Sequence, residues 1–215
     1  MDGAADTGAH DVALRNEYPV SWFLSVNDFA RATPWLHAPM RIFAQYGIVL
    51  FAALLLWSWW RARRAADART MAAALWAPVG ALVAIGVNQP ISNLVAEPRP
   101  YAVFPHALVL VGRSSDYSFP SDHAVLAGAV AAGVMLTHRR LGLVALLAAI
   151  VMAFARVYVG AHFPRDVIVG LLLGAGVVVM GYLVVRRLLT WVTMSLTRTA
   201  LRPLLTDSPK AGRAQ

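Results

Sequence analysis

Residues 165–185 read RDVIVGLLLGAGVVVMGYLVV, a run that is almost wholly apolar after its first two residues. A helix rises about 1.5 Å per residue, so a run of this length can cross the roughly 30 Å hydrocarbon core of a bilayer. Pro164 precedes the run, where a helix start tolerates proline, and Arg186 and Arg187 follow it. The run therefore predicts a membrane-spanning helix.

Four further apolar runs precede this one, and we predict that they span the membrane at 42–60, 70–95, 122–138 and 141–159. The third is the shortest and covers roughly 26 Å as a helix, so its start should lie below the outer interface. Only 14% of the residues are charged and 59% are hydrophobic, whereas a soluble domain carries about 25% charged residues. The sequence predicts an all-α integral membrane protein, a bundle of about five transmembrane helices.

The segments outside the spans are more polar. Residues 1–17 lack the hydrophobic region of a signal peptide and are predicted to be a disordered leader. Residues 18–39 mix aromatic with polar side chains, which favours an N-terminal amphipathic helix in the interface, with a soluble loop as the alternative. Residues 188–203 are predicted to form a second interfacial helix and 204–215 a disordered cytoplasmic tail. Residues 18–203 form a single predicted domain.

The formal net charge of +8 does not indicate nucleic acid, because the basic residues are distributed as in membrane proteins. With five spans, the N-terminus lies outside and the C-terminus in the cytoplasm. Twelve of the 19 basic residues then fall on the cytoplasmic side: Arg61, Arg63, Arg64, Arg69, Arg139, Arg140, Arg186, Arg187, Arg198, Arg202, Lys210 and Arg213. The chain has no cysteine, which excludes disulfides and thiolate metal sites.

Three short polar islands stand at the ends of the predicted spans. They are residues 97–101 (EPRPY), 119–123 (FPSDH) and 156–166 (RVYVGAHFPRD). Ionisable groups at membrane depth are costly and usually functional. The topology assigns all three islands to the outer face, although the charge count did not require this agreement. We therefore expect the islands to form one site.

The residue types in the islands suit a phosphate group. Arginine is permanently charged and its planar fork binds phosphate with two hydrogen bonds, and Arg99 and Arg156 come from different helix ends. Ser121 stands where the third span begins, so its hydroxyl and the free N–H groups of Asp122 and His123 can face an anion. The sequence predicts a phosphate-binding site built from these residues.

Two histidines add chemistry to this site. Asp166 follows His162 by four residues, so we expect its carboxylate to hold one imidazole nitrogen and make the other a better nucleophile. His123 would protonate the departing oxygen, and the arginines and helix N–H groups would stabilise the developing charge without a metal or another cofactor. Each residue alone is more typical of an interface anchor or a helix cap than of a catalytic group. Their joint occurrence favours catalysis.

The set resembles the type 2 phosphatidic acid phosphatase superfamily, whose pattern is Lys-x6-Arg-Pro, Pro-Ser-Gly-His and Ser-Arg-x5-His-x3-Asp. The match covers residues 92–166. The resemblance implies that His162 is the nucleophile that becomes phosphohistidine, that Asp166 orients it and that His123 is the general acid. It further implies phosphate binding by Arg99, Arg156 and Ser121, and we add Asp122 to the candidate substrate-binding residues.

The chain departs from this pattern at three positions. Ser92 replaces the lysine, Ala155 replaces the serine before the arginine, and Asp122 replaces the glycine. The loss of the lysine removes one phosphate contact, for which Arg113 or Asn93 could compensate. Asp122 is acidic beside an anion site, so it either points away or has a second role.

The form EPRPY followed by FPSDH is similar to the bacitracin-resistance branch, the undecaprenyl-diphosphatases, and this likeness runs from about residue 26 to 185. It implies a multi-pass enzyme of the bacterial plasma membrane with an extracytoplasmic site. Such an enzyme hydrolyses a polyprenyl diphosphate to the monophosphate, a reaction of peptidoglycan synthesis linked to antibiotic resistance. Other lipid phosphates, namely phosphatidic acid, phosphatidylglycerol phosphate or another prenyl phosphate, remain alternatives. A transporter is a further alternative, and Ser92 in place of lysine disfavours a vanadate-dependent oxidase.

Overall fold

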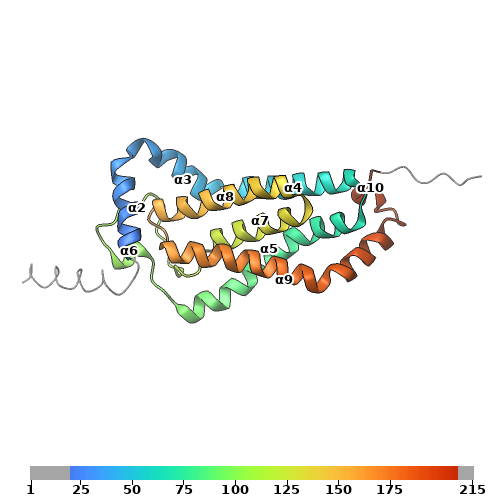
Figure 1. Cartoon of the computed structure of the whole chain (residues 1–215). Helices are drawn as coiled ribbons and strands as arrows, with labels where there is room; N and C mark the ends of the chain where they lie inside the picture. The colour runs from blue at the N-terminus through green and yellow to red at the C-terminus, as the bar shows by residue number, and fades with distance from the viewer. Residues whose placement is uncertain (1–19, 208–215) are drawn as a thin grey trace, which may run out of the picture.

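The computed structural model describes residues 20–207. The predicted leader 1–17 and residues 208–215 of the predicted tail lie outside the described part of the chain. Helices α4, α5, α7, α8 and α9 lie side by side in an elongated bundle, with α2 and α3 folded across one end and α10 at the other (Figure 1). The elements are α2 Val20–Ala32, η1 Pro34–Leu36, α3 His37–Tyr46, α4 Ile48–Ala65, α5 Ala68–Val95, α6 Pro100–Val103, α7 Asp122–Thr137, α8 Arg139–Tyr158, α9 Pro164–Leu196 and α10 Arg202–Leu205.

Within residues 20–207, three helical segments are long and apolar enough to cross a membrane: α5 with α6, α8 and α9. The segment from η1 to α4 adds a fourth if it is counted as one bent span, and α7 is a shorter apolar helix of 16 residues. The predicted all-helical membrane bundle is thereby confirmed, and α7 is short as predicted.

The first predicted span, 42–60, is wrong in its boundaries. The chain bends by 55° between α3 and α4, so the straight helix of the bundle begins at Ile48. The bend lies at Gly47, where an added Cβ would come within 2.5 Å of the Met152 side chain of α8. Glycine thus permits the close approach of this corner to α8.

Helix α7 lies at the centre of the bundle and packs against α4, α5, α8 and α9. Small residues permit its contact with α9: a Cβ at Gly174 would lie 2.0 Å from the Val125 carbonyl oxygen, and one at Gly128 would lie 2.2 Å from that of Leu171. Gly176 of the same helix α9 has no neighbour within 4 Å of such a Cβ. The two backbones are therefore in direct contact along one face only.

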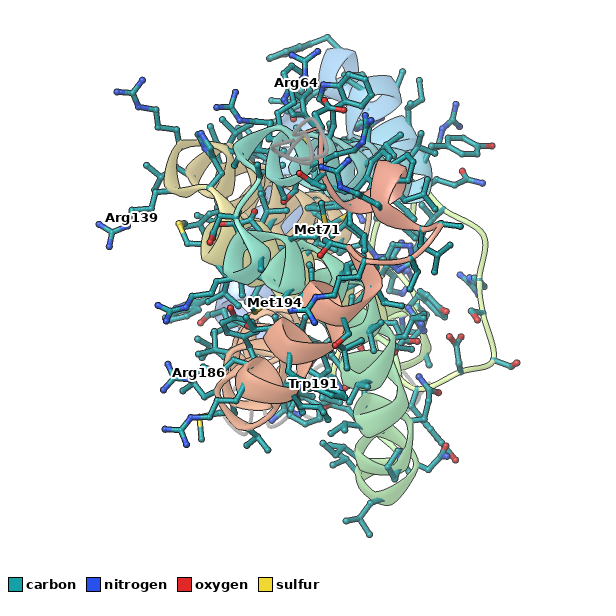
Figure 2. The ribbon with its side chains drawn as sticks, turned by 90° about the vertical axis from the view of Figure 1, so that its right-hand side faces the viewer. Arg64, Met71, Arg139, Arg186, Trp191 and Met194 are labelled. Carbon is teal, nitrogen blue, oxygen red and sulfur yellow. The ribbon has the colours of Figure 1, made fainter. Side chains whose placement is uncertain are left out.

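Helix α9 is longer than predicted and replaces the separate interfacial helix expected over 188–203. It runs unbroken for 33 residues, about 50 Å, because neither glycine nor proline occurs between Tyr182 and Leu196. Its last turns extend towards α10 and carry Arg186 and Trp191 (Figures 1 and 2). Arg64 and Arg139 also project outwards at this end (Figure 2).

The N-terminal segment is helical and packs on the opposite end of the bundle. Phe23, Asn27 and Ala30 of α2 are buried, so the alternative of a soluble loop over 18–39 is wrong. The Asn27 amide donates to the Leu108 carbonyl oxygen at 2.9 Å and accepts from its N–H at 3.0 Å. The polar residue in this aromatic segment therefore fixes the loop between α6 and α7.

Candidate active site

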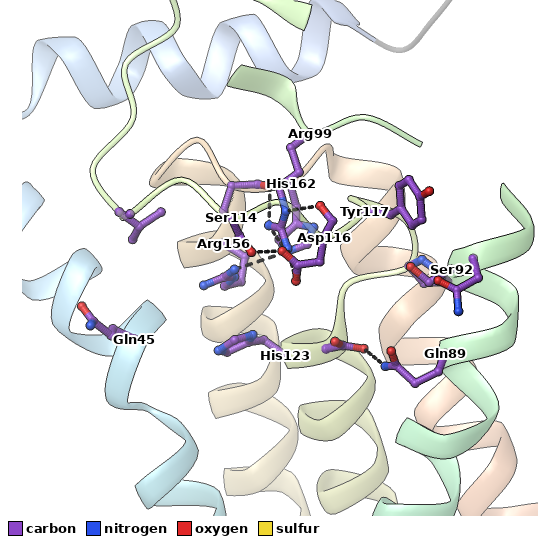
Figure 3. Close-up of a pocket in the computed structure, with 16 residues that line it drawn as sticks. Gln45, Gln89, Ser92, Arg99, Ser114, Asp116, Tyr117, His123, Arg156 and His162 are labelled. Atoms are coloured by element: carbon purple, nitrogen blue, oxygen red, sulfur yellow. Dashed lines mark hydrogen bonds and ion pairs between the residues drawn. The ribbon is translucent and has the colours of Figure 1, made fainter. Parts of the chain in front are cut away.

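The three polar islands meet at one end of the bundle. Arg99 precedes α6, Ser121 precedes α7, Arg156 lies in the last turn of α8, and His162 lies in the loop between α8 and α9. A pocket of about 500 Å³ opens there, lined by Arg99, His123, Arg156, His162 and polar residues of α5, Gln89, Ser92 and Asn93 (Figure 3). The predicted gathering of the islands into one site is seen in the structure.

His162 is buried at the inner wall of this pocket, and its neighbours fix its tautomer. Its Nε2 atom lies 3.2 Å from Nη1 of Arg99 and 3.3 Å from Nη2 of Arg156. A guanidinium group can only donate, so Nε2 must carry the lone pair. Its Nδ1 atom lies 2.8 Å from the Ser118 carbonyl oxygen, which can only accept, so Nδ1 carries the proton. The unprotonated nitrogen of His162 therefore points between two arginines.

Burial lowers the pKa of His162 well below its ordinary value of 6.5, and the positive charges of Arg156 and Arg99 lower it further. The hydrogen bond to the Ser118 carbonyl opposes this effect. The imidazole is consequently neutral at pH 7, which is the form that a nucleophile requires.

The backbone of the loop before α9 places His162. Gly160 adopts φ +77°, a left-handed conformation, and a Cβ there would come within 2.5 Å of the Leu108 carbonyl oxygen. The next residue, Ala161, donates its N–H to the Arg156 carbonyl oxygen at 3.1 Å and accepts from Arg99 Nη1 at 3.1 Å. Both arginines thus hold the loop as well as the imidazole.

Asp166 does not form the hydrogen bond to His162 that the sequence suggested. Its Oδ2 atom lies 3.7 Å from Nδ1, within ion-pair distance, and accepts instead from Ser118 Oγ at 2.6 Å and from the Phe163 N–H at 2.9 Å. The physical reason is that Asp166 is the third residue of α9, where a carboxylate binds the free N–H groups of the helix start. Ser118, which sequence reasoning missed, stands between the two residues.

Two buried donors in the site have no hydrogen-bond partner within residues 20–207. They are Ser121 Oγ and Arg156 Nε. An unpaired buried polar group is costly and rare, so such groups usually serve a ligand. Both donors belong to residues predicted to bind phosphate. His123 also projects towards the pocket from the first turn of α7 (Figure 3).

This arrangement of a neutral histidine between two arginines is accompanied by a family match: the model of the PAP2 superfamily matches residues 73–190. The chain belongs to the PAP2 superfamily. It is accordingly a membrane phosphatase, and the resemblance seen in its motifs is confirmed.

Curated relatives match most of the chain at modest identity. This chain is 29% identical over 159 residues to the bacitracin transport permease protein BcrC of Bacillus licheniformis, and the matched region covers 74% of this chain and 76% of that protein. It is 26% identical over 165 residues to the undecaprenyl-diphosphatase BcrC of Bacillus subtilis, covering 76% and 81%. The crystal structure of a transmembrane PAP2 type phosphatidylglycerolphosphate phosphatase from Bacillus subtilis matches with a TM-score of 0.59. At 21% identity over 79% of this chain and 87% of the other, it shows that the fold is shared.

The glycine of the PAP2 pattern is replaced here by Asp122, whose carboxylate is turned towards α5. Its Oδ1 atom accepts from Asn88 Nδ2 at 2.7 Å and from Gln89 Nε2 at 3.0 Å. The carboxylate lines the pocket but makes no contact with either arginine at hydrogen-bond distance. Asp122 therefore has the second role that the sequence left open, since it ties α7 to α5.

The lysine of the PAP2 pattern is replaced by Ser92, and two residues were candidates to compensate. Asn93 lines the pocket beside Ser92, whereas Arg113 does not. The Arg113 guanidinium lies 5.7 Å from the centre of the Tyr101 ring. Asn93 is thus the better placed of the two.

In the part of the chain from 20 to 207, no three His, Asp or Glu side chains are grouped as metal ligands. The charged side chains that line the pocket are two arginines, Arg99 and Arg156, and two carboxylates, Asp116 and Asp122. The two arginines, which converge on His162, suit an anionic ligand.

Proposed function

We propose that this PAP2 phosphatase hydrolyses the terminal phosphate of a polyprenyl diphosphate, such as undecaprenyl diphosphate, through a phosphohistidine at His162. The observation that carries the chemistry is the convergence of Arg99 and Arg156 on the unprotonated Nε2 of His162. Support for the substrate comes from the relative named as an undecaprenyl-diphosphatase, which this chain matches over 76% of its length.

In the first step, the terminal phosphate lies between Arg99 and Arg156 and accepts from the unpaired Ser121 hydroxyl and Arg156 Nε. His162 Nε2 attacks phosphorus, and the bond from phosphorus to the bridging oxygen breaks. His123 donates a proton to that oxygen, which leaves on the lipid monophosphate. The arginines stabilise the charge on the transferred group, as in other phosphoryl transfers.

In the second step, water attacks the phosphohistidine. His123, now neutral, takes a proton from the water, the bond between nitrogen and phosphorus breaks, and inorganic phosphate leaves. The electron pair returns to Nε2, so His162 regains its starting tautomer. During both steps, His162 Nδ1 keeps its proton and donates it in a hydrogen bond to the Ser118 carbonyl oxygen, and Asp166 offsets the positive charge on the ring from 3.7 Å.

The proposed orientation has the site on the extracytoplasmic face of a bacterial plasma membrane and the C-terminus in the cytoplasm. It is supported by Arg64, Arg139 and Arg186, which project at the end of the bundle far from the site, as expected of cytoplasmic residues (Figures 1 and 2). The lipid tail would lie between the helices, with its diphosphate in the pocket.

The test is phosphate release by purified protein in detergent from undecaprenyl diphosphate, phosphatidic acid and phosphatidylglycerol phosphate. We expect the diphosphate to have the highest kcat/KM, and the choice of substrate is wrong if it has the lowest.

The phosphohistidine mechanism is tested separately, with substrate that carries a label on its terminal phosphate. His162→Asn should abolish turnover and the acid-labile label on the protein. His138→Asn is the matched control, because His138 caps α8 at the far end, and asparagine retains that capping ability. Equal labelling of both variants would refute the phosphohistidine.

A further inference from the structure

One of the two arginines that face His162 is bonded to an acidic side chain of the protein itself. Asp116, in the loop between α6 and α7, has its Oδ2 atom 3.1 Å from Arg99 Nη2 and its carbonyl oxygen 3.1 Å from Arg99 Nε. The third nitrogen, Nη1, faces His162 and Ala161. Arg99 therefore presents two of its three nitrogens to Asp116 and one to the nucleophile (Figure 3).

The loop holds this carboxylate in place. The Tyr101 hydroxyl donates to the Ser114 carbonyl oxygen at 2.9 Å and accepts from the Ser114 N–H at 2.8 Å. The Ser114 hydroxyl in turn donates to Asp116 Oδ1. Two residues further along, the buried Ser118 is bonded through its N–H to the Glu97 carbonyl oxygen at 2.8 Å. Asp116 is thus positioned between two anchored points.

The Asp116 side chain is nevertheless 59% exposed, whereas that of Arg99 is 8% exposed. An ion pair with one solvated partner is weak, so it can open without a large cost. A dianionic phosphate offers Arg99 the same kind of oxygen acceptors and can also contact Arg156 and Ser121. Carboxylate and phosphate therefore compete for one guanidinium group.

We propose that Asp116 is an internal competitor for phosphate at Arg99, which lowers the affinity of the site for the inorganic phosphate product and so promotes its release. The inference rests on the proposed function, in which Arg99 binds the transferred phosphate. The substrate remains bound despite this competition because its lipid tail adds binding energy that inorganic phosphate lacks. After hydrolysis, Asp116 returns to Arg99 and the free dianion leaves.

The physical argument is a population effect. If Arg99 is paired with Asp116 for most of the time, the apparent affinity for any competing anion is the intrinsic affinity multiplied by the fraction of time that Arg99 is free. Removing the carboxylate removes that competition and one negative charge near the ligand. We therefore expect tighter phosphate binding when Asp116 is neutral, by roughly two- to fivefold for a pair with one exposed partner.

The chain offers a matched control in Asp207, a partly exposed carboxylate that is paired with Arg63 at the other end of the bundle. Asp207→Asn removes the same charge without freeing Arg99. If the effect requires competition at Arg99, this variant should bind phosphate as tightly as the wild type.

The experiment is calorimetric titration of purified wild type, Asp116→Asn, Asp116→Ala and Asp207→Asn with inorganic phosphate, together with phosphate inhibition of turnover. We expect the Kd and the inhibition constant of both Asp116 variants to fall roughly two- to fivefold. Unchanged or weaker phosphate binding by the Asp116 variants would overturn the inference, as would equal tightening by Asp207→Asn.

Two further outcomes separate this inference from the proposed function. If the wild type neither binds phosphate nor hydrolyses the lipid, the proposed function fails. If it does both but the Asp116 variants bind phosphate no more tightly, only the competitor role fails. Asp116→Glu covers the case in which the neutral variants do not fold. It keeps the charge but shifts the carboxylate relative to Arg99, so its phosphate Kd should lie between that of the wild type and a roughly fivefold lower value. Binding weaker than that of the wild type contradicts the inference.

Discussion

Ser118→Ala should destabilise the protein while leaving most of its activity. The substitution removes one hydrogen bond, the 2.6 Å contact from Ser118 Oγ to Asp166 Oδ2, at a site where both side chains are fully buried. A hydrogen bond to a charged group contributes about 1.5–3 kcal/mol, so we expect a loss of about 2 kcal/mol in the free energy of unfolding. The acceptor of the His162 Nδ1 proton is the backbone carbonyl of residue 118, which alanine keeps. We therefore expect kcat to fall by less than about tenfold.

Ser121→Ala is the matched control, and we expect it to lose activity while keeping its stability. This serine is as buried as Ser118, but its hydroxyl has no hydrogen-bond partner within residues 20–207. Removing an unpaired buried hydroxyl costs no hydrogen bond in the folded state, so the unfolding free energy should stay unchanged or rise. If the hydroxyl binds the transferred phosphate, kcat/KM should fall by about 10–100-fold, the value of a hydrogen bond to a charged group.

The two variants are compared by thermal unfolding in one detergent and by steady-state phosphate release. A loss of about 2 kcal/mol corresponds to a decrease of roughly 4–8 °C in Tm for a chain of this length. The reasoning is refuted if Ser118→Ala keeps its Tm and loses activity by more than a hundredfold. It is equally refuted if Ser121→Ala is the less stable of the two and keeps full activity.

Three further predictions concern the same end of the bundle. Arg156→Lys keeps the charge but loses the planar fork, so kcat/KM should fall by about 10–100-fold in steady-state assays; an unchanged value would argue against bidentate binding. The folded-state pKa of His162 lies below its unfolded value of 6.5, so the unfolded chain takes up the proton first and stability is lost as the pH falls below 6.5. The free energy of unfolding should therefore fall less between pH 7.5 and 5.5 in His162→Asn than in the wild type, by up to about 1.4 kcal/mol per pH unit below 6.5, as measured by thermal unfolding. An equal fall in both proteins would contradict the lowered pKa of His162. Gly160→Ala should lower the unfolding free energy by about 1–3 kcal/mol, because alanine is strained at φ +77° and would contact the Leu108 carbonyl oxygen, whereas Gly86→Ala, with no neighbour within 4 Å, should not.

The gathering of Arg99, Arg156, His162 and Ser121 was predictable from the sequence, because each stands at the end of an apolar run and the number of runs sets the face on which it lies. The helical class of the fold was predictable for the same reason. These inferences need only the length and order of the spans.

The contacts that tune the site were not predictable in this way. The carbonyl oxygen of Ser118 binds His162, and a backbone acceptor leaves no signal in the residue type. Asp116 reaches Arg99 through an irregular loop whose conformation depends on Tyr101 and Ser114. Ser118 and Asp116 stand within five positions of Ser121, and this closeness in the sequence was the only sign that they could belong to the site.

The helix boundaries were misjudged where hydropathy and helix formation differ. The sequence IFAQYGIVLF stays apolar across Gly47, so composition alone does not reveal a bend there. Conversely, Arg186 and Arg187 end the apolar run, but arginine is a good helix former, so α9 continues beyond them.

The direct backbone contact between α7 and α9 has a consequence for how this protein can diversify. Ser121 and His123 begin one of these helices and Asp166 the other, so their spacing is set when the chain folds, before any lipid binds. The walls of the pocket that carry Gln89, Asn93 and Asp116 belong to α5 and to the loop, outside that tight contact. Substitutions there can accumulate and change which headgroup fits the pocket, while the spacing of Ser121, His123 and Asp166 passes unchanged from one descendant to the next.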